Sequence, residues 1–568
     1  MTLDFSRYPQ TPHGGTLVDQ VVPADRRDAE TQRARALPGI RVDLEAIITI
    51  EMIATGVLSP ARGFMNEADY LSVLEHGRLA GGVVWPVPLS FAPTGKVNAE
   101  VIAGLSVGDE VALTDSDDDP VAILAIEDIF SYDREFRARK LFGTTDRNHP
   151  GVDSIYRRMG EVALGGTLHL LKRVDWGPFE ALRREPKDTW RLFYEEKGFR
   201  SVAGFITGAN PLHRGHEYIH RNALEEVDGI FLQPLVEMAK REYVRHEYRI
   251  RGYRNVMDQY YPAERSILSP LRVTYIFAGP REAILHALIM KNYGCTHALI
   301  GRDHAGIGDY YDKYASHSVF DEYSADELGI DVRLFHEVFY DARAAVHATE
   351  RTMASDDVRY RLNISGTGIR ELLRYGFMPP KEVVRPESAL AAIQGVQPKG
   401  LGEDGRATIT PVGKVIKSMF PFYLEYTRLG GQPREVPLKV EDLTYADLET
   451  VIRDVREHTG LIYQDVYDEY SEVLDRTRSL QPSWREEARA GLRSRQEQLV
   501  AELEQKHAQA DETASDEFMY QDREEAEREL AAARRLLAEI PADLTDDALA
   551  ARVWNPMPYA RYRGADEE

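Results

Sequence analysis

Cysteine is almost absent from this chain. Its 568 residues include a single cysteine, Cys295, so the chain cannot close an internal disulfide. The usual zinc frameworks need several cysteines and are excluded for the same reason. Such sparing use of cysteine fits a reducing compartment, and we expect a cytoplasmic protein.

Long hydrophobic runs are absent as well. No stretch approaches the roughly 18 consecutive apolar residues of a membrane-spanning helix, so we expect no membrane partner. The first residues, Met1–Phe5, lack the basic and apolar segments of a secretory signal, and we expect no signal peptide. Hydrophobic residues still make up 43% of the 568 residues, enough for the cores of roughly three or four domains.

Positive charge is the minority sign. The chain has 70 lysines and arginines against 93 aspartates and glutamates, a formal net charge of −23. Nucleic-acid-binding proteins normally carry a basic stripe, so we expect no nucleic-acid partner. A local basic pocket for an anionic substrate is still compatible with this balance.

The order of predicted elements indicates an α/β protein built from several units. Short β-prone runs such as Val83–Leu89 and Glu110–Leu113, separated by Pro and Gly, predict a mixed, mostly β domain over 1–172. Strands and helices alternate over 173–330, which favours a parallel sheet with right-handed crossovers. A smaller α/β unit follows at 331–390.

The second unit has four strand candidates and one prominent helix. The predicted strands are Ser201–Thr207, Gly229–Leu235, Val273–Phe277 and His297–Ile300, and the helix is Arg281–Asn292. The carboxyl ends of such parallel strands are where α/β proteins bind ligands.

One of these strand ends carries the most specific pattern in the chain. The run Ser201–Thr207 meets a turn of Gly, Asn and Pro, and a helix begins at once with His213 and His216. Histidines three residues apart lie on one face of the first helical turn. The partial positive charge and free N–H groups of a helix N-terminus suit a phosphate. A bare His-x-x-His is more often one capping and one packed histidine, but the rest of the chain reverses those odds.

A comparable loop follows the strand that ends at Ile300. It reads Gly301-Arg302-Asp303-His304-Ala305-Gly306, so a cation and a histidine again follow a strand. A turn held by an Arg–Asp pair is the alternative interpretation. Two such loops at the same edge of one sheet would face a common crevice, and we therefore favour a functional role.

Two other segments are candidates for contact with anions. A basic cluster follows the strand that ends at Leu235, and it consists of Lys240, Arg241, Arg245, Arg249 and Arg251. A solvated helix face is the favoured interpretation of such a charge run, and a segment facing a polyanion is the alternative. The stretch Ile364–Arg370 predicts a helix start, with Ser365 or Thr367 as the N-cap.

The composition changes towards the C-terminus. Residues 391–439 have the Gly, Pro and Lys content of a linker, and 440–568 are rich in Glu, Arg, Ala and Leu. A capping box at Ser483–Glu486 and leucines at heptad-like spacing predict a pair of long helices, for which an antiparallel coiled coil is one arrangement. No P-loop motif occurs there, so we expect assembly of a homo-oligomer and not kinase chemistry.

Eight short stretches of the chain follow one another in an order that is itself informative. They are Pro12–Gly15, Gly56–Met65, Phe142–Asp146, Asn210–His216, Ala278–Ala283, Lys291–Cys295, Gly301–Gly306 and Ile364–Thr367. Together they resemble the motifs of the ATP sulfurylases, or sulfate adenylyltransferases. The resemblance implies a PUA-like N-terminal domain, a Rossmann-like nucleotidyltransferase domain of the HxGH type and a small third domain. The helical C-terminal extension lies outside it.

The chemistry that this resemblance implies is transfer of a nucleotidyl group from ATP to a small oxyanion. Such a reaction needs positioning and positive charge rather than covalent help. Mg²⁺ would arrive with the phosphates of ATP, so we expect no protein metal site. The implied catalytic residues are Asn210, His213, His216 and Arg302. The implied nucleotide contacts are Asn210, His213, His216, Gly301, Asp303, His304 and Ser365, and the implied acceptor contacts are Thr207, Ala209, Arg302 and Ala305.

The acceptor end departs from the family pattern. The family usually reads Gln-Thr-Arg-Asn before the proline, where this chain reads Thr207-Gly208-Ala209-Asn210. The Gln and the Arg are sulfate ligands in the family, and losing the Arg removes a permanently charged, bidentate partner. A neighbouring strand ends in Gln233-Pro234-Leu235-Val236-Glu237 instead of His-Pro-Leu-Val-Gly. Arg302 or the basic cluster is the candidate replacement for the lost charge.

Three functions are therefore compatible with the sequence. Adenylyl transfer to sulfate is the first, and transfer to a phosphonate, a phosphate ester or a carboxylate is the second. The third is a nucleotide-binding scaffold without catalysis, with the helical extension as its partner surface. The retained histidines and the arginine of the two loops argue against the scaffold.

Overall fold

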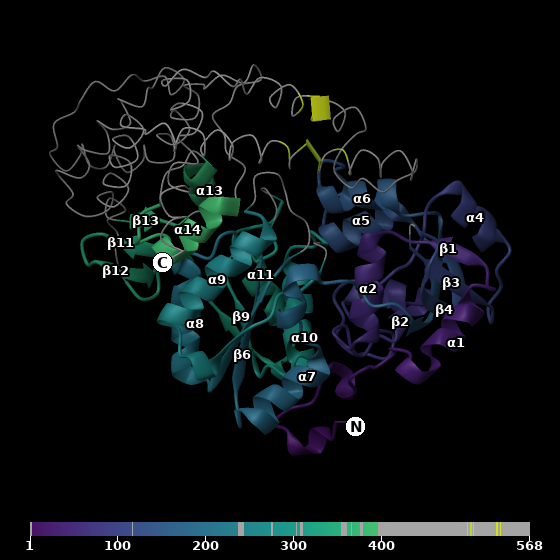
Figure 1. Cartoon of the computed structure of the whole chain (residues 1–568), viewed down its shortest axis with the longest axis horizontal. Coiled ribbons are helices and arrows are strands. Elements are labelled where there is room, and N and C mark those ends of the chain that lie inside the picture. Colours follow the sequence, from purple (N-terminus) through teal and green to yellow (C-terminus); the bar gives the residue numbers. More distant parts are fainter. Residues whose placement is uncertain are drawn as a thin grey trace.

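The computed structural model describes most of the chain up to residue 395. The described ranges are 3–115, 117–236, 244–273, 276–302, 304–306, 310–353, 361–364, 366–374 and 379–395, with residues 497, 500, 501, 504, 530, 531 and 534. Figure 1 shows an N-terminal body on the right, a central body built on a sheet and a smaller unit at the upper left. Among the described residues, no helix has the length and apolarity needed to cross a bilayer.

The N-terminal body is a five-stranded sheet with helices around it. The strands, in sheet order, are β1 (Gly39–Arg41), β3 (Glu110–Thr114), β4 (Pro120–Ser131), β5 (Val162–Leu170) and β2 (Gly63–Phe64). Its helices are α1 (Ala24–Ala34), α2 (Leu44–Ala54), α3 (Glu67–His76), α4 (Lys96–Ala103), α5 (Arg134–Phe142) and α6 (Pro150–Arg158). The strand predicted at Glu110–Leu113 is confirmed by β3.

The strand predicted at Val83–Leu89 is wrong. The structure describes this whole stretch, and within it only Val84 forms an isolated bridge, to Arg78. Pro86 and Pro88 lack the N–H groups that a ladder requires, so the apolar run packs as extended coil instead.

The central body is a five-stranded parallel sheet. Its order is β10 (Asp331–Leu334), β9 (His297–Ile300), β6 (Val202–Thr207), β7 (Gly229–Pro234) and β8 (Ser266–Leu268). The chain runs outward from β6 to β8 and then returns to β9 on the other side of β6. The order therefore reverses between β6 and β9, which makes that point of the sheet the expected crevice for a ligand.

Three of the four strands predicted for this body are confirmed by β6, β7 and β9. The prediction of a strand at Val273–Phe277 is wrong, because no described residue of that stretch is in a strand. Phe277 has a φ of 61°, which no strand tolerates. The edge strand is β8, only three residues long, and β10 extends the sheet past residue 330.

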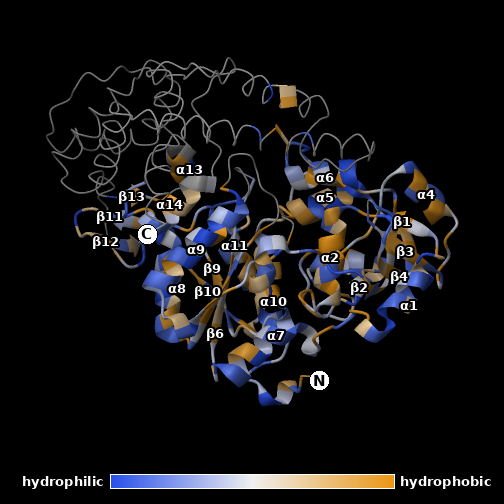
Figure 2. Cartoon of the chain, in the orientation of Figure 1, coloured by the Kyte–Doolittle hydropathy of each residue, from blue (hydrophilic) through white to orange (hydrophobic). Residues whose placement is uncertain are grey.

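Helices cover both faces of the central sheet. On one face α8 (Arg214–Glu226) and α9 (His246–Tyr260) share a core with Phe205 and Leu232. On the other face lies α10 (Pro280–Asn292), whose residues from Glu282 onward are all buried. Figure 2 shows the contrast between the hydrophobic centre and the hydrophilic outer side of α8. The predicted helix Arg281–Asn292 is confirmed by α10.

The smaller unit closes over the carboxyl edge of this sheet. Its antiparallel strands are β11 (Val338–Asp341), β12 (Val346–Thr349) and β13 (Arg361–Asn363), with helices α13 (Gly366–Arg374) and α14 (Pro386–Gly395). Arg385, just before α14, pairs with Glu217 of α8 at 2.8 Å. Between β9 and β10 lie two short helices, α11 (Ala315–Ser318) and α12 (Ala325–Leu328), and α7 (Pro186–Trp190) precedes β6.

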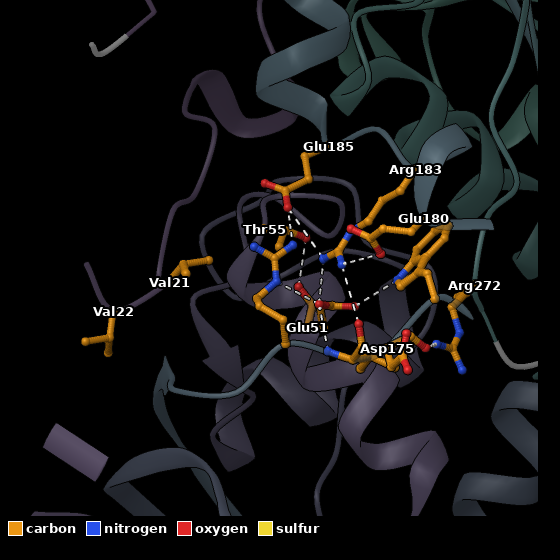
Figure 3. A network of polar contacts seen from close by, with 12 residues as sticks. Val21, Val22, Glu51, Thr55, Asp175, Glu180, Arg183, Glu185 and Arg272 are labelled. Atoms are coloured by element: carbon orange, nitrogen blue, oxygen red, sulfur yellow. Dashed lines mark hydrogen bonds and ion pairs between the residues drawn. The ribbon is translucent and has the colours of Figure 1, made fainter. Parts of the chain in front are cut away.

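A buried carboxylate joins the N-terminal body to the central one (Figure 3). Glu51 of α2 accepts hydrogen bonds from Arg173 Nε at 2.8 Å and from Arg183 Nη2 at 2.7 Å. Both arginines also face Glu185, at the start of α7. Arg173, Arg183 and Glu185 belong to the segment through which the chain passes from the N-terminal body to the central one, and Glu51 anchors that segment to α2.

Only seven residues of the C-terminal extension are described. All seven are helical, Val500 and Leu530 are buried, and Arg534 Nη2 lies 2.8 Å from Glu504. Two helical segments of the extension therefore contact each other. The rest of the predicted coiled coil lies outside the described residues.

Candidate functional site

The turn between β6 and α8 is fixed by its own side chains. Thr207 Oγ1 accepts a hydrogen bond from the N–H of Ala209 at 3.0 Å. Asn210 Oδ1 accepts from the N–H of Val244 at 2.9 Å, and its Nδ2 donates to the carbonyl of Val244 at 3.2 Å. All three residues of the turn are buried. The predicted residues Thr207, Ala209 and Asn210 thus form one rigid segment at the carboxyl end of β6.

The two histidines lie next to each other at the start of α8. His213 is the N-cap, and its carbonyl accepts the N–H groups of His216 at 3.0 Å and Glu217 at 3.2 Å. The two rings are 3.7 Å apart, centre to centre. A Cβ on Gly215 would lie 3.2 Å from the His213 ring, so the glycine between the histidines leaves room for that ring.

Burial keeps both imidazoles neutral. It is the main cause that lowers the pKa of His213 well below its usual value, and the neighbouring His216 adds to the effect. Burial and then the charge of Arg249 lower the pKa of His216 to about 3. Both Nδ1 atoms are buried without a hydrogen-bond partner. Each neutral ring can donate one hydrogen bond to a phosphate oxygen.

The loop after β9 is held in place by contacts with α10 and α11. His286 Nδ1 and His304 Nε2 are 2.8 Å apart, and Ser316 Oγ donates to the carbonyl of His304 at 2.6 Å. Burial lowers the pKa of His304 to about 4. Ala305 has a φ of 57°, a conformation that a non-glycine residue adopts at a cost and that clusters at functional sites.

The two loops follow neighbouring strands. Strands β6 and β9 are neighbours, with Ala203 opposite His297. A Cβ on Gly301 would lie 3.8 Å from Ile219, so the start of the β9 loop reaches α8. The two predicted loops thus follow adjacent strands of one sheet, and the crevice between them stays a prediction.

One predicted site residue, Arg302, has an ion pair, and several others lie outside the described residues. The guanidinium of Arg302 is 37% exposed and pairs with Glu337 at 3.2 Å. Asp303 and Ser365 lie outside the described residues, as do Lys240 and Arg241. The described part of the β9 loop is thus Gly301, Arg302 and the three residues from His304.

Two arginines reach the β6 turn from other elements. Arg370 of α13 donates from Nη1 to the carbonyl of Asn210 at 3.0 Å. Arg249 of α9 donates from Nη2 to the carbonyl of Thr207 at 3.4 Å. The sequence placed Arg370 at a candidate phosphate-binding helix start, and its position beside the turn agrees with that. Arg249 was only one of five basic residues, and its burial is a tertiary property that no local pattern reveals.

The site has no resident metal cage in the part of the chain that the structure describes. No group of three or more His, Cys, Asp or Glu side chains there is placed to hold an ion. Imidazole, amide and guanidinium groups line the two loops, and these donors suit phosphate oxygens. The described side chains of the two loops are thus hydrogen-bond donors of the kind that suits an anion.

Comparison with known proteins gives the same picture for the first two thirds of the chain. A PUA-like domain model matches residues 10–173, and an ATP-sulfurylase model matches 180–394. A sulfate adenylyltransferase from Halothermothrix orenii is 41% identical over 389 residues, 68% of this chain and 99% of the relative. One from a Synechococcus species is 41% identical over 403 residues, 71% of this chain and 100% of the relative.

A solved structure also shares the fold. The hexameric APS kinase from Thiobacillus denitrificans superposes with a TM-score of 0.54 at 21% identity, covering 78% of this chain and 82% of that one. At such low identity the likeness concerns the fold alone. The relatives above, by contrast, are aligned over nearly their whole length at 41% identity. The chain belongs to the ATP-sulfurylase family, the sulfate adenylyltransferases.

Proposed function

We propose that this protein transfers the adenylyl group of ATP to sulfate, giving adenylyl sulfate and pyrophosphate. A sulfate oxygen forms a bond to the α-phosphorus. The bond from that phosphorus to the bridging oxygen of the β-phosphate breaks, and its electron pair leaves with pyrophosphate. The observation that carries the proposal is the position of the His213–His216 pair and of the loop after β9, which follow β6 and β9, the neighbouring strands between which the strand order reverses.

The histidines are the proposed stabilisers of the transition state. Negative charge grows on the equatorial oxygens of the α-phosphate and on the leaving pyrophosphate. Neutral His213 and His216, beside the N-terminus of α8, would donate hydrogen bonds to these oxygens without first taking up a proton. Preorganised donors of this kind need no rearrangement as the charge develops.

The remaining residues of the two loops have supporting roles in this proposal. Asn210 is already committed through its side chain to Val244, so we assign it the geometry of the turn. Gly301, Asp303, His304 and Ser365 are proposed nucleotide contacts. Thr207, Ala209, Arg302 and Ala305 are the proposed acceptor side.

Magnesium enters this account with the substrate. The described residues supply no cluster of acidic or imidazole ligands for it, and the triphosphate itself offers the oxygens that Mg²⁺ prefers. We therefore treat MgATP as the substrate. We also propose that the protein works in the cytoplasm as a homo-oligomer.

Pyrophosphate release over a panel of oxyanions tests the proposal. We expect turnover with sulfate to exceed turnover with phosphate, a phosphonate, a phosphate ester and a carboxylate at equal concentration. Faster pyrophosphate release with one of the other anions would identify that anion, and not sulfate, as the acceptor. No release with any of them, together with retained ATP binding, would favour the non-catalytic scaffold.

A further inference from the structure

Arg249 is an unusual cation for its position. The residue is 3% exposed, and its Nε is buried without a hydrogen-bond partner. Its Nη2 donates a hydrogen bond to the carbonyl of Thr207, at a long 3.4 Å. No described carboxylate forms an ion pair with it. A guanidinium that is removed from water without a counter-ion destabilises a folded protein.

Two partly buried arginines of the same structure have counter-ions, whereas the buried Arg137 has no ion pair to a described carboxylate and lies 5.6 Å from the centre of the Tyr70 ring. Arg158 contacts both Asp43 and Glu45. Arg385 makes a two-pronged contact with Glu217, at 2.9 Å from Nε and 2.8 Å from Nη2. Arg249 differs from Arg158 and Arg385 in that no carboxylate among the described residues pairs with it.

The position of Arg249 matches the altered part of the acceptor motif. Thr207 is the last residue of β6, and its hydroxyl accepts the N–H of Ala209. The guanidinium thus lies at the segment where the family motif carries its arginine and this chain carries Ala209. Tyr253, one turn further along α9, places a buried hydroxyl next to Arg249 and Thr207.

The other candidate cations are engaged elsewhere. Arg302 pairs with Glu337 at 3.2 Å. The guanidinium groups of Arg245 and Arg251 both contact the Tyr248 ring, at 4.8 and 5.1 Å from its centre. Of the candidates that the structure describes, Arg249 combines burial with contact to the β6 turn.

We propose that Arg249 is the acceptor-binding cation, and that sulfate bonds to its guanidinium while lying against Ala209. The inference rests on the proposed function and adds the residue that confers affinity for a dianion. A cation set behind the turn replaces one carried on the turn itself. Binding of the acceptor would then also relieve the unpaired charge of Arg249.

Substrate-specific kinetics test this assignment. The variants are Arg249→Met, Arg249→Lys and, as a matched control, Arg254→Gln, which alters an exposed arginine of the same helix. With Arg249→Met we expect the KM for sulfate to rise about 10- to 100-fold, the usual consequence of losing a hydrogen bond to a charged group. The KM for ATP should change far less. Arg249→Lys should recover part of the affinity, and Arg254→Gln should match the parent.

A thermal-shift measurement gives a readout that does not need turnover. Each protein is saturated with magnesium α,β-methylene-ATP, whose α–β linkage is not cleaved, and sulfate is then added. Sulfate should raise the Tm of the parent and of Arg254→Gln, because a ligand that binds only the folded state stabilises it. It should not raise the Tm of Arg249→Met. The shift caused by the nucleotide analogue alone reports whether that variant is folded.

The outcomes separate the two proposals. A parent that releases no pyrophosphate with sulfate contradicts the proposed function and, with it, this inference. A parent that uses sulfate, combined with an Arg249→Met variant whose sulfate KM and sulfate-induced Tm shift are unchanged, contradicts the inference alone. An equal rise in both KM values would assign Arg249 to the structure of the turn instead of to the acceptor.

Discussion

Two imidazoles that stay neutral are central to the proposed chemistry at the scale of single residues. Burial lowers the pKa of His213 and His216 so far that neither ring takes up a second proton near neutral pH, and each keeps one N–H donor. A charged imidazolium would attract the triphosphate more strongly in the ground state. A neutral donor instead favours the transition state, where the oxygens gain charge.

Removing either ring should therefore affect the rate more than binding. For His213→Ala and for His216→Ala we expect kcat for pyrophosphate release to fall about 100-fold or more, with circular dichroism like that of the parent. His220→Gln is a suitable control, because His220 lies on the same helix but bonds Tyr261 at 2.8 Å. Near-parental turnover by either alanine variant would remove the histidines from the mechanism.

The depressed pKa of His216 also predicts how stability depends on pH. Its pKa is about 3 in the folded protein and 6.5 as the ordinary value, so between these values only the unfolded chain binds the proton. The stability linked to this group is complete above pH 6.5 and is lost as the pH falls towards 3. His216→Asn should reduce the slope of unfolding free energy against pH in this window by up to about 1.4 kcal/mol per pH unit. Urea unfolding at a series of pH values measures the slope, and parallel curves for both proteins would refute the assignment.

At the scale of elements, α8 joins the sheet to the smaller unit. Glu217 lies in the first turn of α8 and is buried. Its carboxylate accepts two hydrogen bonds from the guanidinium of Arg385, which precedes α14. The Arg385 guanidinium also stacks on the Tyr260 ring of α9, at 3.6 Å from its centre. This contact holds the helix of the two histidines against the unit that carries Arg370.

Breaking that contact should destabilise the protein. Glu217→Ala leaves Arg385 without its carboxylate, and we expect a loss of about 3 kcal/mol in unfolding free energy. Glu226→Ala, near the other end of α8, removes a 58% exposed carboxylate that pairs with Arg333, and should cost less than about 1 kcal/mol. Denaturant titration compares the two. Equal losses of unfolding free energy in the two variants would contradict a larger contribution from the Glu217–Arg385 pair.

The elements that the sequence predicted correctly are those with a strong local signal. Strands β6, β7 and β9 are apolar runs bounded by turns, and α10 follows a Pro start. Strand β8 escaped prediction because three residues carry no periodic pattern. The apolar stretch at Val273–Phe277 looked like a strand, yet the backbone of Phe277 turns into the left-handed region.

The same distinction applies to the candidate site, where contiguous motifs could be predicted and contacts between separate elements could not. The histidine pair and the two glycine-containing loops are contiguous in sequence, so their motifs could be recognised. Arg249 could not be told apart from Arg245 or Arg251, because only the packing of α9 against β6 decides which arginine is buried. Similarly, the contact of His286 with His304 joins two elements and has no sequence signature.

At the scale of the whole molecule, three motif stretches of the N-terminal body contact the central body. The N–H of His13 donates to Asn292 Oδ1 at the end of α10, and Asn292 Nδ2 donates to the carbonyl of Ser59. Tyr310, beyond the β9 loop, donates to Asp146 at 2.9 Å. The N-terminal body thus supports both α10 and the loop that follows β9.

The C-terminal extension should contribute to assembly. The family models end at residue 394, and the contact between Glu504 and Arg534 joins two helical segments beyond that point. Deleting residues from about 440 onward should change the mass of the particle in light scattering and leave pyrophosphate release with sulfate intact. Unchanged mass together with lost activity would assign the extension to the catalytic cycle.

Product stoichiometry tests the central claim most directly. The full-length protein is incubated with MgATP and radiolabelled sulfate, and pyrophosphatase is added to draw the reaction forward. We predict one labelled molecule that co-migrates with adenylyl sulfate for each pyrophosphate released, and the loss of both products in His213→Ala. Pyrophosphate release without transfer of label to the nucleotide would show that water or another anion is the acceptor, and would contradict adenylyl transfer to sulfate.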